Sequence, residues 1–108
     1  MWKSWCGRVP KFSVKWSEAA REDYREIRAY LGEQAPWYVV ELVRDVEKSL
    51  WPLREWPRYY PRYMRRPELG LRKIVMGNYL LFYRVLEKQR VVRVVRMFHG
   101  AMNVGALL

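Results

Sequence analysis

The spacing of apolar residues in this chain of 108 residues differs between two long segments, with a helical period over residues 18–53 and strand-like runs over residues 71–98. Between residues 18 and 53, apolar residues recur every three or four positions, which is the period of helices with one buried face. Between residues 71 and 98, β-branched and aromatic residues are enriched, which is typical of strands. This segregation of helices and strands indicates an α+β fold.

Two helices are predicted in the first half. Ser17 offers a hydroxyl N-cap to a first helix over roughly residues 18–31, and Gly32 is expected to end it. Pro36 suits the first turn of a second helix, and the short connection between the two predicts an antiparallel helix hairpin. The apolar stripe of the second helix is predicted at Val39, Val43, Val46, Leu50 and Leu53.

Four strands are predicted around this hairpin. Alternating apolar and polar residues over positions 12–16 indicate a short first strand. Three further strands, over residues 71–76, 79–86 and 91–98, are separated by short turns, and they predict a three-stranded antiparallel meander. The expected order is therefore a short strand, an antiparallel helix hairpin and then the meander, with the hairpin covering one sheet face and the other face left accessible.

One domain is expected over residues 12–108. Residues 1–11 show neither period and are interpreted as an N-terminal extension, either disordered or an artefact of start-codon choice. The lone Cys6 cannot form an internal disulfide, the N-terminus lacks the apolar region of a signal peptide, and no apolar stretch is long enough to span a membrane. A cytoplasmic protein without membrane association is the expectation.

The positive charge of the chain points to its partners. Lys and Arg number 21 against 11 Asp and Glu, which gives a formal net charge of +10 at pH 7. Such an imbalance speeds encounters with polyanions and with acidic protein surfaces. A merely soluble basic surface is an equally good interpretation of the charge alone.

Residues 56–70 break both periods. Three prolines interrupt any helix there, and arginines alternate with tyrosines. The tyrosines could stack on unpaired bases while the arginines bind phosphates. Packing of the tyrosines at the edge of a core is the favoured alternative.

Few residues could carry catalysis. His99 is the only histidine and Cys6 the only cysteine, so no zinc site, no other metal site and no small-molecule cofactor is expected. One arrangement remains: Arg72 and Lys73 open one strand and His99 follows the last, so that they could meet at one sheet end and cleave a phosphodiester. A strand-end histidine bonded to the backbone is the favoured alternative.

The order of elements and three segments of sequence resemble a known superfamily. The segments are WSEAA at residues 16–20, LGLRKIVMGNYLLFYRV at residues 69–85 and VVRMFHG at residues 94–100, with ALL closing the chain at residues 106–108. Together they resemble the RelE/ParE superfamily of bacterial toxins over residues 12–108. The Tyr83-Arg84 pair and the Phe98-His99-Gly100 ending are closer to the ParE branch.

The resemblance implies the toxin of a type II toxin–antitoxin system, neutralised by a cognate antitoxin protein. In the ParE branch the target is DNA gyrase, and no RNA is cut. In the RelE branch the toxin is a ribosome-dependent mRNA endonuclease, for which Arg72, Lys73 and His99 are the catalytic candidates. A degenerate toxin that only binds its antitoxin is a third reading.

The resemblance also implies which residues bind the target. A set of cationic residues and the lone histidine is expected to do so: Arg62, Arg65, Arg66, Arg72, Lys73, Arg84, Arg96 and His99. The tail at residues 101–108 is expected to be a docking element. An Arg usually follows the His-Gly pair closely in the ParE branch, whereas Ala101-Met102-Asn103 follow it here, which implies a loss of activity. The nuclease branch usually has an Arg or Tyr near the C-terminus, and Met102 and Leu107 do not replace it, which favours a weakened or non-nuclease toxin.

Overall fold

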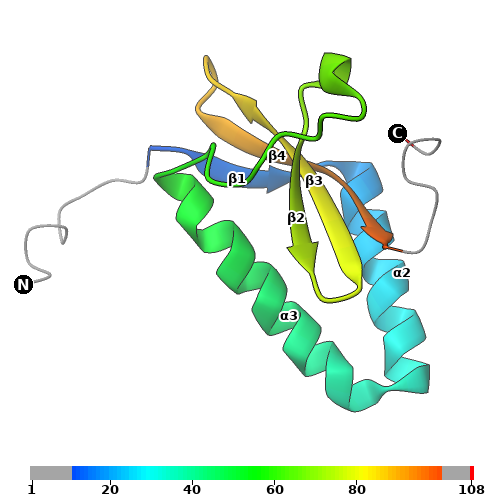
Figure 1. Ribbon diagram of the computed structural model, residues 1–108. Coiled ribbons are helices and arrows are strands. Elements are labelled where there is room, and N and C mark those ends of the chain that lie inside the picture. The colour runs from blue at the N-terminus through cyan, green and yellow to red at the C-terminus, as the bar shows by residue number, and fades with distance from the viewer. Residues whose placement is uncertain (1–10, 101–107) are drawn as a thin grey trace, which may run out of the picture.

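The computed structural model describes residues 11–100 and residue 108. Two helices pack on a four-stranded sheet, and Figure 1 shows the helices as a V that is closed where α2 meets α3. The elements are β1 (Ser13–Trp16), α2 (Glu18–Gln34), α3 (Pro36–Leu50), β2 (Arg72–Met76), β3 (Tyr79–Leu86) and β4 (Val91–His99), with short 3-10 helices at Trp51–Arg54 and Pro67–Leu69. The predicted α+β class and order of elements are confirmed. The expectations for residues 1–10 and 101–107 lie outside the described residues.

The first helix, α2, begins at the predicted cap. The Ser17 hydroxyl accepts a hydrogen bond from the Ala20 N–H at 3.0 Å and donates one to the Val95 carbonyl at 2.8 Å. It therefore caps the helix and ties it to the sheet. The predicted end at Gly32 is wrong, because the helix continues to Gln34 and only Ala35 separates it from α3.

The buried face of α3 is rotated slightly from the predicted stripe. Leu42 is 1% exposed and was not in that stripe, whereas Val39 and Val43 are only half-buried. Val46, Leu50 and Leu53 are buried as predicted. Leu53 is buried because the chain continues past α3 as the short 3-10 helix at Trp51–Arg54.

The sheet has the order β1-β4-β3-β2. β1 pairs with β4 in parallel, and the other neighbours are antiparallel, so the predicted meander gains a fourth strand on its β4 side. β1 reaches only as far as Val94, so residues 95–99 of β4 have no strand beside them on that edge. The first half of α2 lies against this open edge, where Ser17 and Asp23 bond the β4 backbone.

A bulge in β4 sets which side chains face the helices. The pairs Phe82 with Arg96 and Tyr83 with Val94 leave Val95 as the extra residue. Before the bulge, Val94 belongs to the core under the helices; after it, Met97 does. Strict alternation would have placed Arg96 on the helix side, and the bulge moves it to the opposite face.

A second apolar cluster lies on the sheet face away from the helices. This outer cluster consists of Tyr63, Leu71, Phe82 and Phe98. Residues 61–63 run along the free edge of β2, where the Tyr63 N–H donates to the Leu71 carbonyl at 2.8 Å. The face that was expected to be accessible is therefore partly covered, because these large apolar side chains need a partner to leave water.

Candidate cationic interface

Positive charge is concentrated on the sheet half of the molecule. Residues 18–50, which include both long helices, carry eight acidic and five basic side chains. Residues 56–100 carry two acidic and eleven basic side chains. The eleven are Arg58, Arg62, Arg65, Arg66, Arg72, Lys73, Arg84, Lys88, Arg90, Arg93 and Arg96. The positive net charge therefore resides mainly in the sheet and the loop before it, whereas the helix hairpin is slightly acidic.

Four cations belong to the sheet face away from the helices. Lys73 and Arg96 are the two cross-strand neighbours of Phe82, one on β2 and one on β4. Arg84 and Arg93 form the next cross-strand pair along β3 and β4. We call these four residues, Lys73, Arg84, Arg93 and Arg96, the cationic face. These cations share the sheet face of the buried outer cluster.

Arg84 and Arg93 stand directly opposite each other. Arg93 alternates with buried Val92 and Val94, so its exposed side chain projects away from the helices. The Arg84 Nε donates to the Leu69 carbonyl at 2.9 Å, which holds this side chain in place. Like charges at opposite positions of neighbouring strands destabilise a sheet. An anion bound between the two guanidinium groups would remove that repulsion.

Arg96 is fixed at the edge of β4 by Asp23 of α2. Its Nε and one terminal nitrogen donate to the Asp23 carboxylate at 2.7 and 3.0 Å, and the Met97 N–H donates to the same carboxylate at 3.0 Å. The guanidinium carbon lies 4.8 Å from the centre of the Phe98 ring. The hydrogen bond to Asp23 raises the pKa of Arg96, so this side chain stays charged. Its charge is largely balanced by Asp23 and contributes less to the cationic face than Arg93.

Arg72 has a structural role that the sequence did not reveal. One terminal nitrogen donates to the Tyr60 carbonyl at 2.7 Å and to the Arg58 carbonyl at 3.3 Å. Arg72 pairs with Tyr83, which belongs to the core under the helices. Arg72 is therefore on the sheet face opposite to that of Lys73. The guanidinium therefore holds residues 58–60 against the start of β2.

The structure does not bring Arg72, Lys73 and His99 together. Arg72 and Lys73 pair with Tyr83 and Phe82, whereas His99 pairs with Tyr79 at the opposite end of β3. On β3, the partner of His99 is three residues from the partner of Lys73 and four from that of Arg72, which corresponds to about 10–13 Å along the strand. The expectation of one shared sheet end fails because the β2–β3 turn reverses direction, which places the start of β2 at the far end from the finish of β4. His99 instead lies edge-on to Tyr79, with 5.3 Å between ring centres.

The remaining predicted residues lie in the loop after α3. Arg62 and Arg65 are exposed, and Arg66 bonds Glu68 at 2.6 Å. Tyr63 packs edge-on against Phe82, with 5.0 Å between ring centres, so it serves the outer cluster. Its ring also lies 6.0 Å from the Lys73 Nζ. For Tyr63, the structure therefore agrees with the favoured interpretation that the loop tyrosines pack at the edge of a core.

Sequence reasoning missed two residues of this interface. Arg93 is absent from the predicted target-binding set, although its alternation with Val92 and Val94 is a usable sequence signal. Asp23 stands among several other polar residues on α2, and nothing in its sequence context marks it. Only the tertiary contact with Arg96 identifies it.

Tyr83 makes the fold sensitive to alkaline pH. It is fully buried, its hydroxyl donates to the Pro57 carbonyl at 2.7 Å, and burial raises its pKa to about 12. An unfolded tyrosine has a pKa of about 10, so the stabilisation is complete below pH 10 and is lost as pH rises through about 12. We expect a loss of roughly 2–3 kcal/mol from this residue over that window.

Urea unfolding at pH 9 and near pH 12 would measure this loss. Tyr83→Phe removes the titrating group, so its stability should fall less over the same window. Tyr59→Phe, at an exposed ring, is the matched control and should behave like the unsubstituted chain. An equal alkaline loss in the Tyr83→Phe variant would contradict the assignment.

Neither a metal centre nor a membrane span is found in the ranges that the structure covers. Among residues 11–100 and 108, no group of three or more His, Cys, Asp or Glu side chains is placed to hold a metal ion. No helix in these ranges is long and apolar enough to cross a bilayer.

Comparisons with known proteins identify the family. Residues 14–104 match the profile of the ParE toxin of the type II toxin–antitoxin system parDE. A chain of the chromosomal ParDE system from P. aeruginosa is similar in fold, with a TM-score of 0.67, 19% identity, and coverage of 84% of this chain and 98% of that one. A chain of the RelBE2 toxin–antitoxin complex from Mycobacterium tuberculosis gives a TM-score of 0.58, 26% identity, and coverage of 88% and 97%. No curated protein sequence matches significantly. Because the family profile covers most of the sequence, the chain belongs to the ParE toxin family of type II toxin–antitoxin systems.

Proposed function

We propose that this toxin inhibits growth by binding a macromolecular target, DNA gyrase, through its cationic face, and that a cognate antitoxin neutralises it. The observation that carries the proposal is the opposed pair Arg84 and Arg93 on the exposed sheet face. Two guanidinium groups held this way repel each other in the free protein and gain when a carboxylate or phosphate binds between them. Arg62 and Arg65, both exposed, extend the positive surface along the loop.

Binding without catalysis is supported by the placement of the nuclease candidates. His99 is aligned with the far end of β2 from Arg72 and Lys73. Arg72 donates to two backbone carbonyls, so its guanidinium already has partners. A proton carrier about 10 Å from the cation that should stabilise the phosphorane is too distant for concerted in-line cleavage.

The antitoxin proposal rests on the family and on charge. Both similar structures are of toxin–antitoxin systems. A strongly basic sheet half is expected to attract an acidic antitoxin segment over long range and to speed its association. A short reading frame adjacent to this one that encodes an acidic protein, and whose co-expression relieves growth inhibition, would be the partner.

The gyrase target is tested with purified enzymes. Supercoiling of relaxed plasmid should stall when this protein is added to gyrase at equimolar or greater amounts, and the antitoxin should restore it. A topoisomerase that relaxes DNA without gyrase subunits is the control and should be unaffected. Unchanged supercoiling at saturating toxin would overturn the gyrase target and leave the family assignment in place.

The alternative target is the ribosome, and one observation favours it. Lys73 and Arg96 flank Phe82 across three strands, so two cations of one sheet face could bind phosphates of a message. In that case a translated message should be cut, and His99→Ala should abolish cutting. A chain that neither inhibits gyrase nor causes cleavage of a message, and only binds its antitoxin, would be a degenerate toxin.

A further inference from the structure

A groove at the open end of the V formed by the helices concentrates positive charge. β1 crosses this open end between the start of α2 and the end of α3 (Figure 1). The groove has a volume of about 620 Å3 and is lined by α2, by α3 with the 3-10 helix Trp51–Arg54, and by β1. Its charged side chains are one carboxylate, Glu47, and three arginines, Arg21, Arg28 and Arg54, which we call the groove arginines. The groove is therefore positively charged, although the helix hairpin is acidic overall.

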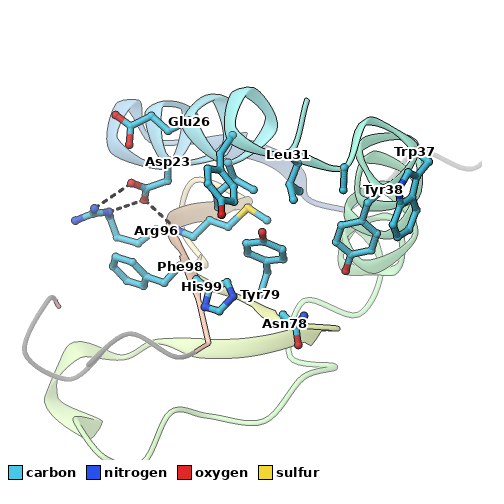
Figure 2. A pocket seen from close by; sticks show the side chains of 14 residues that line it. Asp23, Glu26, Leu31, Trp37, Tyr38, Asn78, Tyr79, Arg96, Phe98 and His99 are labelled. Atoms are coloured by element: carbon cyan, nitrogen blue, oxygen red, sulfur yellow. Dashed lines mark hydrogen bonds and ion pairs between the residues drawn. The ribbon is translucent and has the colours of Figure 1, made fainter. Parts of the chain in front are cut away.

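The groove arginines have no carboxylate partner in the part of the chain that the structure describes. The ion pairs within residues 11–100 and 108 do not include any of the three. Arg96 is the contrasting case, because two hydrogen bonds join its guanidinium to the Asp23 carboxylate, as Figure 2 shows. Cations that share one groove repel each other, and a multivalent anion bound among them would remove that repulsion. The groove is thus suited to an anionic ligand.

Aromatic rings hold two of the groove arginines in place. The guanidinium carbon of Arg28 lies 4.4 Å from the centre of the Tyr24 ring, and the Arg28 Nε donates to the Tyr24 carbonyl at 3.4 Å. The guanidinium carbon of Arg54 lies 4.4 Å from the centre of the Trp51 ring. A guanidinium has several N–H donors, and contact with a ring face leaves its positive charge in place. Two cations are therefore positioned in advance, which lowers the entropy cost of binding an anion.

An exposed indole lies beside these cations. Trp51 lines the groove and is 66% exposed. Trp16 and Tyr24, which also line it, stack on each other with 5.1 Å between ring centres and 19° between ring planes. Because both rings of that stack are half-buried, Trp51 is the aromatic side chain of the groove that is most open to a flat ligand. Any nucleobase can stack on such an indole, because every base has an aromatic face.

We propose that this groove binds a nucleoside di- or triphosphate. The groove arginines bind the phosphates, since guanidinium N–H donors match phosphate oxygens, and the base stacks on Trp51. A purely anionic ligand would leave the indole in water, whereas a nucleotide carries phosphates and a flat ring in one molecule. The volume of the groove is within the range of small-molecule sites. The proposal goes beyond the proposed function and does not depend on it, because the cationic face lies on the other side of the sheet.

The test compares ATP with tripolyphosphate on the 15N-labelled full chain, followed by NMR at physiological ionic strength. Charge alone predicts that tripolyphosphate, the more highly charged of the two, binds more tightly. The groove predicts that ATP binds about fivefold or more tightly than tripolyphosphate, with a shift of the Trp51 indole N–H, because only ATP has a base to stack. ATP binding that is no tighter than that of tripolyphosphate would overturn the proposal. Tighter binding of the acidic peptide acetyl-Glu-Glu-Trp-Glu-amide at the groove would do the same.

Paired arginine variants separate the groove from the net charge. Arg21→Gln with Arg28→Gln should weaken ATP and tripolyphosphate about tenfold or more. Arg44→Gln with Lys48→Gln makes the same change in net charge at exposed positions of α3 outside the groove, and it should weaken ATP less than about twofold. Equal losses in the two double variants would contradict a site in the groove.

Two further variants assign the base and exclude the cationic face. Trp51→Ala should weaken ATP about fivefold or more and leave tripolyphosphate unchanged, whereas Trp56→Ala, at a ring that is 61% exposed elsewhere, should change neither. Arg84→Gln with Arg93→Gln should change the ATP affinity less than about twofold. Loss of ATP binding in this last variant would place the nucleotide on the cationic face and refute the groove as its site.

Discussion

Replacing Arg84 and Arg93 together by glutamine is expected to abolish growth inhibition without weakening the fold. Each guanidinium is expected to make a charge-assisted hydrogen bond to the target, worth roughly 1.5–3 kcal/mol, so the double variant should bind at least about 100-fold more weakly. Removing two like charges from opposed positions should offset the loss of the Arg84 hydrogen bond to the Leu69 carbonyl, so the free energy of unfolding should change by less than about 1 kcal/mol. Growth on induction, target binding and urea unfolding are the three measurements.

A control with the same change in net charge is available on the helices. Arg21→Gln with Arg44→Gln removes two exposed arginines from α2 and α3. This variant should lose little target affinity, because the field of the whole molecule is screened over about 10 Å at ordinary ionic strength. Equal losses in both double variants would show that net charge, and not the cationic face, carries the binding.

The substitution Phe82→Ala is expected to cost about 3–5 kcal/mol of the free energy of unfolding. Phe82 has no exposed surface, lies edge-on to Tyr63 and Phe98 with ring centres 5.0 and 6.1 Å away, and forms the centre of the outer cluster. Truncation would open a cavity between the sheet and the loop that covers it. A loss of this size is a large share of the stability of a typical domain of this length.

Urea or guanidinium unfolding measures the loss, with Val75→Ala as the control. Val75 is also a β-strand residue, but it is 63% exposed, so its truncation should change stability by less than about 0.5 kcal/mol. The loop should lose protection from hydrogen exchange in the Phe82→Ala variant before the helices do, since Tyr63 loses its packing partner. A cost below about 1 kcal/mol would mean that the outer cluster does not stabilise the fold.

Local pattern was sufficient for most of the fold. The strand boundaries, to within one residue, and the cap at Ser17 follow from periodicity and side-chain chemistry, and the structure confirms them. The predicted helix end at Gly32 is wrong because the chain does not turn at this glycine, and the turn comes at Ala35. The parallel pairing of β1 with β4 joins residues almost 80 positions apart, and no local signal encodes it.

The candidate site was harder to predict because it depends on register. Sequence reasoning proposed Lys73, Arg84 and Arg96, which the structure places on one sheet face. It grouped Arg72 with Lys73 although neighbouring residues of a strand point to opposite faces. His99 lies at a strand end, as Arg72 and Lys73 do, but each turn reverses the chain, so these strand ends are at opposite ends of the sheet.

The extra residue at Val95 has a consequence for how relatives of this toxin should be compared. One inserted position exchanges inside and outside for everything that follows it in the strand. Two relatives that differ by such an insertion would present different side chains to their targets even if every other residue of the strand were identical. An alignment that ignores the inserted position would therefore equate a residue that contacts the partner in one protein with a core residue in the other.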